Sequence, residues 1–173
     1  MKKLLQNFLF LLFVAQPSFA QNAPATIANN LNPSFLIGQA DLKNLALKVY
    51  HIELWSEAKN FSYDKKFAIR IVYDVNVAKD NLLKKSMAEI ESLHVLSDQD
   101  KKNYALQLEK ILTEIKKGDE KVTLFNPAQG IETFYNGKPN GKISDPKLAR
   151  FLVDIWLDER GSHPDITRKI LGK

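Results

Sequence analysis

The most suggestive pair of chemistry-bearing residues is His51 and Glu53, in the run LKVYHIELW. Residues two apart on a strand share one face of a sheet, which is the arrangement that a metal site with two ligands on one strand needs. Zinc sites take three or four ligands, and no nearby residue of this run supplies the others. His94 and His163 stand in predicted loops far along the chain. We therefore expect structural or solvated histidines, and neither a metal nor another cofactor.

Arg70 is a second candidate, because it stands mid-strand in AIRIVY between apolar neighbours. If it faced a cleft, its guanidinium group would be a ready partner for a ligand carboxylate. Strand alternation favours a different interpretation, in which Ala68, Arg70 and Val72 lie on the face away from the core and solvent covers the charge.

Three aromatic residues, Trp55, Tyr73 and Trp156, are candidates for the wall of an apolar pocket. Aromatic side chains at core spacing usually fill the core instead. The chain contains no HExxH, GxSxG or Walker-type motif, and the glycines of NGKPNGK are spaced for turns rather than for a phosphate-binding loop. Motifs therefore assign no catalytic residue.

The N-terminus has the pattern of a secretory signal peptide. Lys2 and Lys3 precede the apolar run 4–15, Pro17 breaks it, and small residues lead to Ala20. We predict cleavage after Ala20 and a periplasmic or secreted protein. The absence of cysteine argues against a lipid anchor and leaves the fold to its core alone.

The rest of the chain has the length of one domain. Residues 21–34 are polar and carry prolines, which predicts a flexible leader before a domain over 35–173. The full chain carries a formal net charge of +5, but lysines and acids are interspersed, so nucleic acid is not an expected partner. No apolar stretch after Ala20 is long enough to span a bilayer, so we expect no stable membrane insertion once the signal is removed. The oligomeric state stays open.

Periodicity predicts strands followed by helices, then strands and helices again. The expected strands cover residues 45–55, 67–75, 122–125, 131–135 and 142–143. The expected helices cover 78–93, a segment from Ser97 to a C-terminal Gly118, a segment that Asp145 begins, and 164–171. This order has no alternating βαβ pattern and indicates an α+β domain with a mostly antiparallel sheet.

The segment FLVDIWLDER belongs to the helix that Asp145 begins. Its apolar positions form one wide face that should pack on the sheet: Leu148, Phe151, Leu152, Ile155 and Trp156. Its charged positions share the opposite side: Arg150, Asp154 and Asp158. We expect a core helix, with ligand lining as the alternative.

The C-terminal third, GIETFYNGKPNGKISDPKLARFLVDIWLDERGSHPDITRKILG, resembles bacterial exported proteins of the chalcone isomerase-like family. The shared features are an NG turn, a short G-x-I strand, an Asp-started helix ending in I-W-L, and a terminal P-x-x-x-R-x-x-L-G segment. The upstream runs IKKGDEKVTLF, LKVYHIELW and AIRIVYDVNV are similar to the family's strands. The resemblance implies an open-faced sandwich, a long antiparallel sheet covered on one face by helices, with a cleft between the two layers.

The resemblance also implies where function would lie. In the plant enzymes the cleft closes a flavonoid ring, and in related proteins it holds a fatty acid. The enzymes' arginine before the first long strand matches Lys43, and their threonine falls at or beside Tyr50. A lysine keeps the charge but loses the planar fork of arginine. The helical tyrosine and asparagine of the enzymes have no counterpart in residues 78–116.

Three hypotheses follow. The first is a non-catalytic protein that binds a small apolar or amphipathic acid, with Lys43, Tyr50, Arg70, Tyr73 and Trp156 at the ligand. The second is an accessory protein with a filled cleft that works through its surface. The third is an intramolecular lyase or isomerase, which needs an acid–base group beside a cation.

Overall fold

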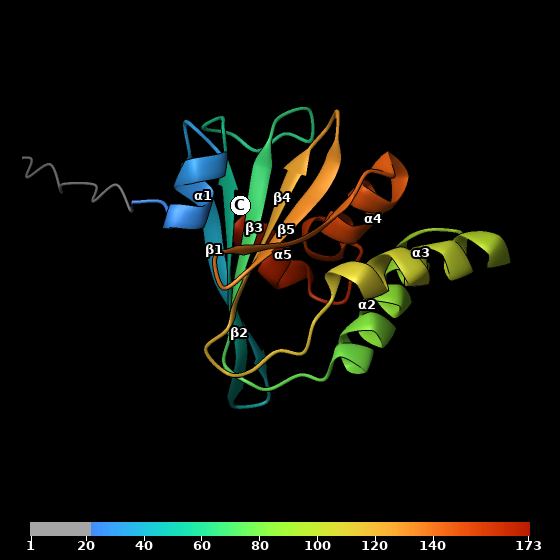
Figure 1. Ribbon diagram of the computed structural model, residues 1–173. Coiled ribbons are helices and arrows are strands. Elements are labelled where there is room, and N and C mark those ends of the chain that lie inside the picture. The colour runs from blue at the N-terminus through green and yellow to red at the C-terminus, as the bar shows by residue number, and fades with distance from the viewer. Residues whose placement is uncertain (1–21) are drawn as a thin grey trace, which may run out of the picture.

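A six-stranded sheet forms the centre of the computed structural model, which describes residues 22–173 (Figure 1). Every neighbouring pair of strands is antiparallel, and the spatial order follows the sequence. The strands are β1 (Phe35–Asn44), β2 (Leu47–Ser56), β3 (Phe67–Tyr73), β4 (Glu120–Asn126), β5 (Gly130–Tyr135) and β6 (Lys138–Ile143).

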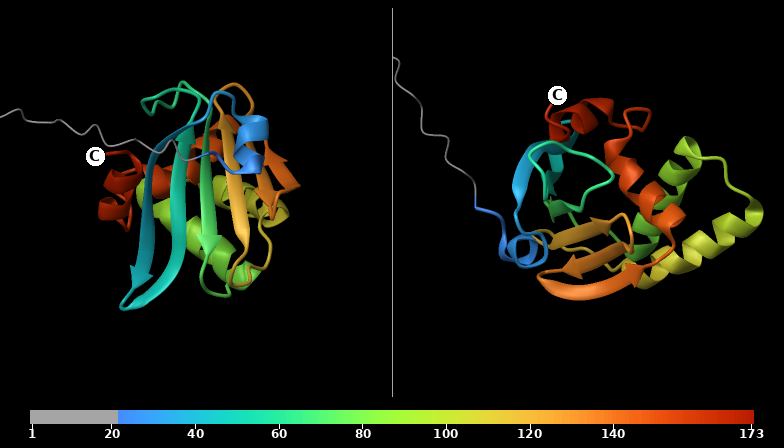
Figure 2. Two further views of the ribbon diagram at one scale, coloured as in Figure 1. Left: turned by 90° about the vertical axis from the view of Figure 1, so that its left-hand side faces the viewer. Right: turned by 90° about the horizontal axis from the view of Figure 1, so that it is seen from above.

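Helices cover the sheet unequally (Figure 2). Four of them pack on one face: α2 (Lys79–Leu93), α3 (Asp98–Ile111), α4 (Pro146–Leu157) and α5 (Pro164–Ile170). Among the described residues, the opposite face carries only the short helix α1 (Ala25–Asn30). This arrangement confirms the predicted α+β open-faced sandwich.

The main core lies between the sheet and the four helices. On β3 the residues Phe67, Ile69, Ile71 and Tyr73 face it, as strand alternation requires. Two helices, α3 and α4, begin where the sequence indicates. The Ser97 side chain accepts a hydrogen bond from the Asp100 amide, and the Asp145 carboxylate accepts from the amides of residues 147 and 148.

The leader predicted over residues 21–34 is ordered where the structure describes it. Helix α1 places Ile27 against Trp55 on the otherwise open face of the sheet, and Leu31 joins the same cluster. Ile27 and Leu31 are both buried. The prediction of a flexible leader weighed polar composition and overlooked these two apolar residues, which are spaced four apart, about one helical turn.

The sequence analysis missed β1. Residues 35–44 pair with β2 in a long hairpin, whereas we expected a strand only from residue 45. Gly38 helped to conceal it, since glycine is depleted in strands. The glycine is required by the packing of another element against the strand. Helix α5 lies so close that a Cβ atom at position 38 would overlap the carbonyl oxygens of Lys169 and Ile170.

Helix α3 ends at Ile111, about two turns before the predicted end at Gly118. Its last carbonyl is held by the sheet, since the Ile111 oxygen accepts hydrogen bonds from Lys121 Nζ at 2.9 Å and Asn140 Nδ2 at 2.7 Å. The chain then runs extended, and Ile115 bridges to Val77. Asn140 and Gly141, which we expected to form a turn, lie within β6.

None of the helices in the described residues has the length and hydropathy that crossing a bilayer requires. The predicted signal peptide, residues 1–20, lies outside the described part of the chain.

Candidate functional site

A cavity of about 390 Å³ lies between the two layers of the fold. Strands β1, β2 and β3 form one wall, and helices α2, α4 and α5, with the loop before α5, form the other. Its apolar lining includes Leu42, Val49, Val77, Leu82, Ile155 and Ile166. Pockets that take small ligands are usually concave and largely apolar, with a few polar groups, and they begin at about 300 Å³.

Three of the candidate ligand-binding residues from the sequence analysis do line this cavity: Tyr50, Tyr73 and Trp156. The two tyrosine rings meet edge to face, with centroids 6.0 Å apart. Burial raises the pKa of Tyr50 to about 12, an effect that a hydrogen bond from Trp156 partly offsets. Burial also raises the pKa of Tyr73. Both phenols are therefore neutral near pH 7 and can donate hydrogen bonds to a ligand.

Glu89 on α2 brings a carboxylate to the same cavity, and the sequence analysis did not identify it. Its Oε1 accepts a hydrogen bond from the hydroxyl of Ser162, in the loop before α5. Its Oε2 is buried and has no hydrogen-bond partner among the described residues. Leaving a buried polar atom unpaired is unfavourable. The cavity thus presents an acceptor that a ligand donor would satisfy.

Lys85 is the cation of the cavity wall. It precedes Glu89 by four residues on α2, so the two side chains emerge on the same side of the helix. The helical spacing of residues 82, 85, 86 and 89 was a usable signal for a cavity-facing stripe. It escaped notice because charged residues on an amphipathic helix are normally assigned to solvent.

Lys43 lies outside this cavity, contrary to the resemblance-based expectation. It lines a separate hollow between β1 and α5, together with polar residues such as Gln39, Asp41 and Lys169. This hollow and another at the C-terminal end of α4 are larger, about 610 and 690 Å³, but charged and polar side chains dominate both surfaces. The apolar cavity is therefore the better candidate ligand site.

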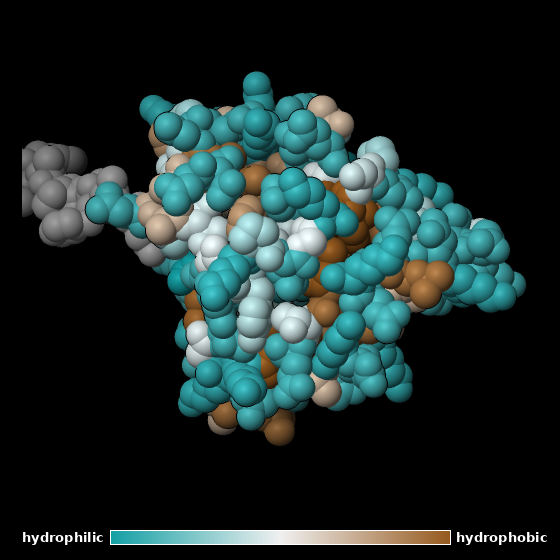
Figure 3. All heavy atoms as spheres, in the orientation of Figure 1, coloured by the Kyte–Doolittle hydropathy of each residue, from teal (hydrophilic) through white to brown (hydrophobic). Residues whose placement is uncertain are grey.

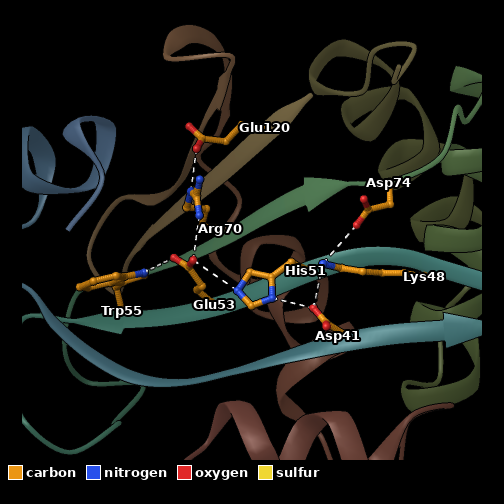
Figure 4. Close-up of polar contacts among 8 residues, drawn as sticks. All are labelled: Asp41, Lys48, His51, Glu53, Trp55, Arg70, Asp74 and Glu120. Atoms are coloured by element: carbon orange, nitrogen blue, oxygen red, sulfur yellow. Dashed lines mark hydrogen bonds and ion pairs between the residues drawn. The ribbon is translucent and has the colours of Figure 1, made fainter. Parts of the chain in front are cut away.

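Arg70 lies on the opposite face of the sheet, so it cannot meet a ligand in the cavity (Figure 4). Its Nη1 is 2.7 Å from Glu53 Oε1 and its Nε is 2.6 Å from Glu120 Oε2. Glu53 also accepts a hydrogen bond of 2.7 Å from Trp55 Nε1. The predicted ligand role of Arg70 is corrected: alternation turned the side chain away from the helices, as the favoured interpretation had it.

His51 and Glu53 do share a face, in the same charged network (Figure 4). His51 Nδ1 lies 2.7 Å from Asp41 Oδ1, and His51 Nε2 lies 3.4 Å from Glu53 Oε1. Lys48 bridges Asp41 and Asp74 at 3.2 and 3.3 Å. The hydrogen bond with His51 is the main cause that lowers the pKa of Asp41, and Lys48 contributes further. In residues 22–173 no group of three or more His, Asp or Glu is placed to hold a metal.

Asp154, expected on the polar side of α4, is buried. Its Oδ1 accepts hydrogen bonds from the Tyr63 hydroxyl at 2.7 Å and from Arg150 Nε at 2.8 Å. His94 Nε2 lies 3.3 Å from Oδ2 but forms no hydrogen bond in the described residues. The loop between β2 and β3 covers this side of the helix, which single-helix periodicity does not reveal. The cluster fastens that loop to α4.

The fold and the cavity define an α+β open-faced sandwich with a ligand-sized apolar space between its layers. Residues 36–172 match the model of the chalcone isomerase-like family, and the chain belongs to that family. Its fold is similar to that of a fatty-acid binding protein from Arabidopsis thaliana, with a TM-score of 0.59, 12% identity, and coverage of 82% of this chain and 88% of that chain. Comparison with curated proteins found no match.

Proposed function

We propose that the protein binds a small apolar or amphipathic acid, of the fatty-acid class, in the cavity between the sheet and helices α2, α4 and α5, and that it does so without catalysis. The observation that carries the proposal is the apolar cavity of about 390 Å³ with neutral tyrosines, a tryptophan and one cation in its wall. The fatty-acid binding protein with the same fold supports it. The alternative hypothesis, an accessory protein that works through its surface, predicts a cleft that side chains fill.

The position of the polar groups suggests how an acid would lie. The hydrocarbon chain occupies the apolar wall, where its burial is favourable. The carboxylate of the ligand points towards Lys85. The carboxylate of Glu89, with its buried oxygen, disfavours a second negative charge beside it and so keeps the ligand's head group out of the interior. The isomerase alternative needs a cation at the family's arginine position inside the cleft, and Lys43 lines a different hollow.

Filling the cavity tests the proposal. Ser86 lies in the cavity wall, so Ser86→Phe should place a ring in the space a ligand would take. We expect the affinity for dodecanoate, measured by isothermal titration calorimetry, to fall by about tenfold or more, since the chain loses apolar contact area. Lys84→Phe is the control, on the same helix and exposed. No binding of dodecanoate or longer fatty acids to the unmodified protein would refute the proposal.

We also propose that the protein is exported. The basic residues, apolar run and small residues of segment 1–20 support a cleaved signal peptide and a periplasmic or secreted location. Intact-mass measurement of the protein recovered from the producing cells is the test. A chain that begins at Gln21 agrees with export, and a chain that retains residues 1–20 in the cytoplasm contradicts it.

A further inference from the structure

The tip of the β1–β2 hairpin, residues Leu45, Ala46 and Leu47, exposes apolar side chains to an unusual degree. Leu45 is 97% exposed and Leu47 is 61% exposed. Leu45 also has a positive φ of 54°, a backbone conformation that residues with a side chain seldom adopt. A turn residue such as Asn or Gly would be soluble there and free of strain. The geometry of the turn therefore does not explain why position 45 is a leucine.

The hairpin tip projects beyond the other strands (Figures 1 and 2). In the space-filling view a few hydrophobic atoms stand at that lower end of the molecule, among hydrophilic ones (Figure 3). The strand residues just behind the tip lead into the ligand cavity, because Leu42 on β1 and Val49 on β2 both line it. Leu45 thus follows a cavity-lining residue of one strand by three positions, and Leu47 precedes one of the other strand by two positions.

Two lysines flank the hairpin tip, one on each strand. Lys43 and Lys48 face each other across the hairpin. Lys48 is paired with Asp41 and Asp74, whereas Lys43 has no acidic partner within 4 Å among the described residues. A leucine tip flanked by lysines suits the boundary between lipid head groups and acyl chains, where cations meet phosphates.

The shape of the tip decides between a protein and a bilayer as its partner. A stable protein interface buries about 800 Å² on each side, over a broad surface. A convex tip with two leucines offers far less, but a fluid bilayer closes around a narrow projection. We propose that the hairpin tip inserts into the head-group region of a lipid bilayer with anionic lipids, and so brings the cavity to the surface that supplies or receives its ligand.

Docking itself does not depend on the proposed function, and only its purpose rests on it. The test is flotation of the whole mature protein with vesicles of phosphatidylethanolamine and phosphatidylglycerol, compared with vesicles of phosphatidylcholine. Leu45→Ser with Leu47→Ser is the variant. The control is Val95→Ser with Leu106→Ser, since those residues are 99% and 61% exposed away from the hairpin. The control therefore removes equally exposed apolar residues from another surface.

We expect the mature protein to bind the anionic vesicles, and the tip variant to bind about tenfold more weakly, because two leucines no longer enter the lipid. The control should bind within about twofold of the unmodified protein, since its changes do not touch the tip. Equal losses in both double variants, an unaffected tip variant, or no binding of the unmodified protein would each overturn the inference. Dodecanoate affinity without vesicles should be the same for all three proteins, so failed docking and failed ligand binding give different results.

Discussion

Each side of the sheet has a glutamate with a buried carboxylate oxygen, and the two carboxylates differ in how they are paired. Glu53, on the face that α1 partly covers, is 2% exposed and receives hydrogen bonds from Trp55 and Arg70. Glu89, on the helix-covered side, has one oxygen bound to Ser162 and one with no partner in the described residues. The paired carboxylate is part of the framework. The unpaired one marks the place where the protein has left hydrogen-bonding capacity for something else.

The same contrast holds for the cations. Arg70 is held between two glutamates, whereas Lys121, which faces the helices, has only the carbonyl oxygen of Ile111 as a partner in residues 22–173. Burial lowers the pKa of Lys121 to about 8, because no acidic group compensates the lost hydration. Glu53 and Arg70 on the open face are thus paired with each other and with further partners, whereas Glu89 and Lys121 on the helix side are incompletely paired within the described residues.

Breaking the network should have the largest effect. Arg70→Ala leaves Glu53 buried without its cation, and we expect a loss of about 3 kcal/mol in the free energy of unfolding. Arg70→Lys restores the charge and should recover part of the lost free energy of unfolding. Urea denaturation measures both. Dodecanoate affinity should not change, because Arg70 lies on the far side of the sheet. Weakened ligand binding in a fully stable Arg70→Ala protein would contradict the distinction between the faces.

Lys121→Met should stabilise the protein at pH 7 by about 2 kcal/mol, since it removes a charge that burial disfavours and loses one hydrogen bond. The pKa of about 8 in the folded protein is below the ordinary lysine pKa of 10.5, so the unfolded chain binds more protons between these values. Stability of the unmodified protein therefore rises with pH across that window, and the burial penalty is fully present below it.

The advantage of Lys121→Met should accordingly shrink as the pH approaches 10.5. Urea denaturation at pH 7 and pH 10 checks this. A variant less stable at both values would show that the hydrogen bond to the end of α3 outweighs the desolvation of Lys121.

Of the three substitutions, Glu89→Gln should have the smallest effect. It tests most directly whether Glu89 faces the ligand in the cavity. Removing the negative charge should tighten dodecanoate binding by about threefold, because a carboxylate ligand no longer meets a like charge. Dodecanol should bind more weakly, since its hydroxyl loses a charged acceptor. Glu91→Gln is the control, being on the same helix but paired with Lys101 at the surface. Identical calorimetric results for both variants would mean that Glu89 does not face the ligand.

Much of the fold could be predicted from local signals. Alternation in AIRIVY placed Arg70 away from the helices, and Ser97 and Asp145 marked helix starts correctly. The site was harder. Tyr50, Tyr73 and Trp156 were identified and do line one cavity, but Glu89 and Lys85 were missed and Lys43 lies elsewhere. Periodicity tells which side of an element faces inward, not whether the space beyond is filled.

The sequence by itself determined the α+β class, the faces of the strands, the chalcone isomerase-like family and the helix caps, because each depends on residues close together in the chain. Only the tertiary structure decided that α5 needs a glycine beneath it at position 38, that Asp154 is buried under the β2–β3 loop, and that a cavity remains behind Trp156. Those features arise where elements far apart in the sequence meet. Their packing depends on volumes and contacts that no single segment encodes.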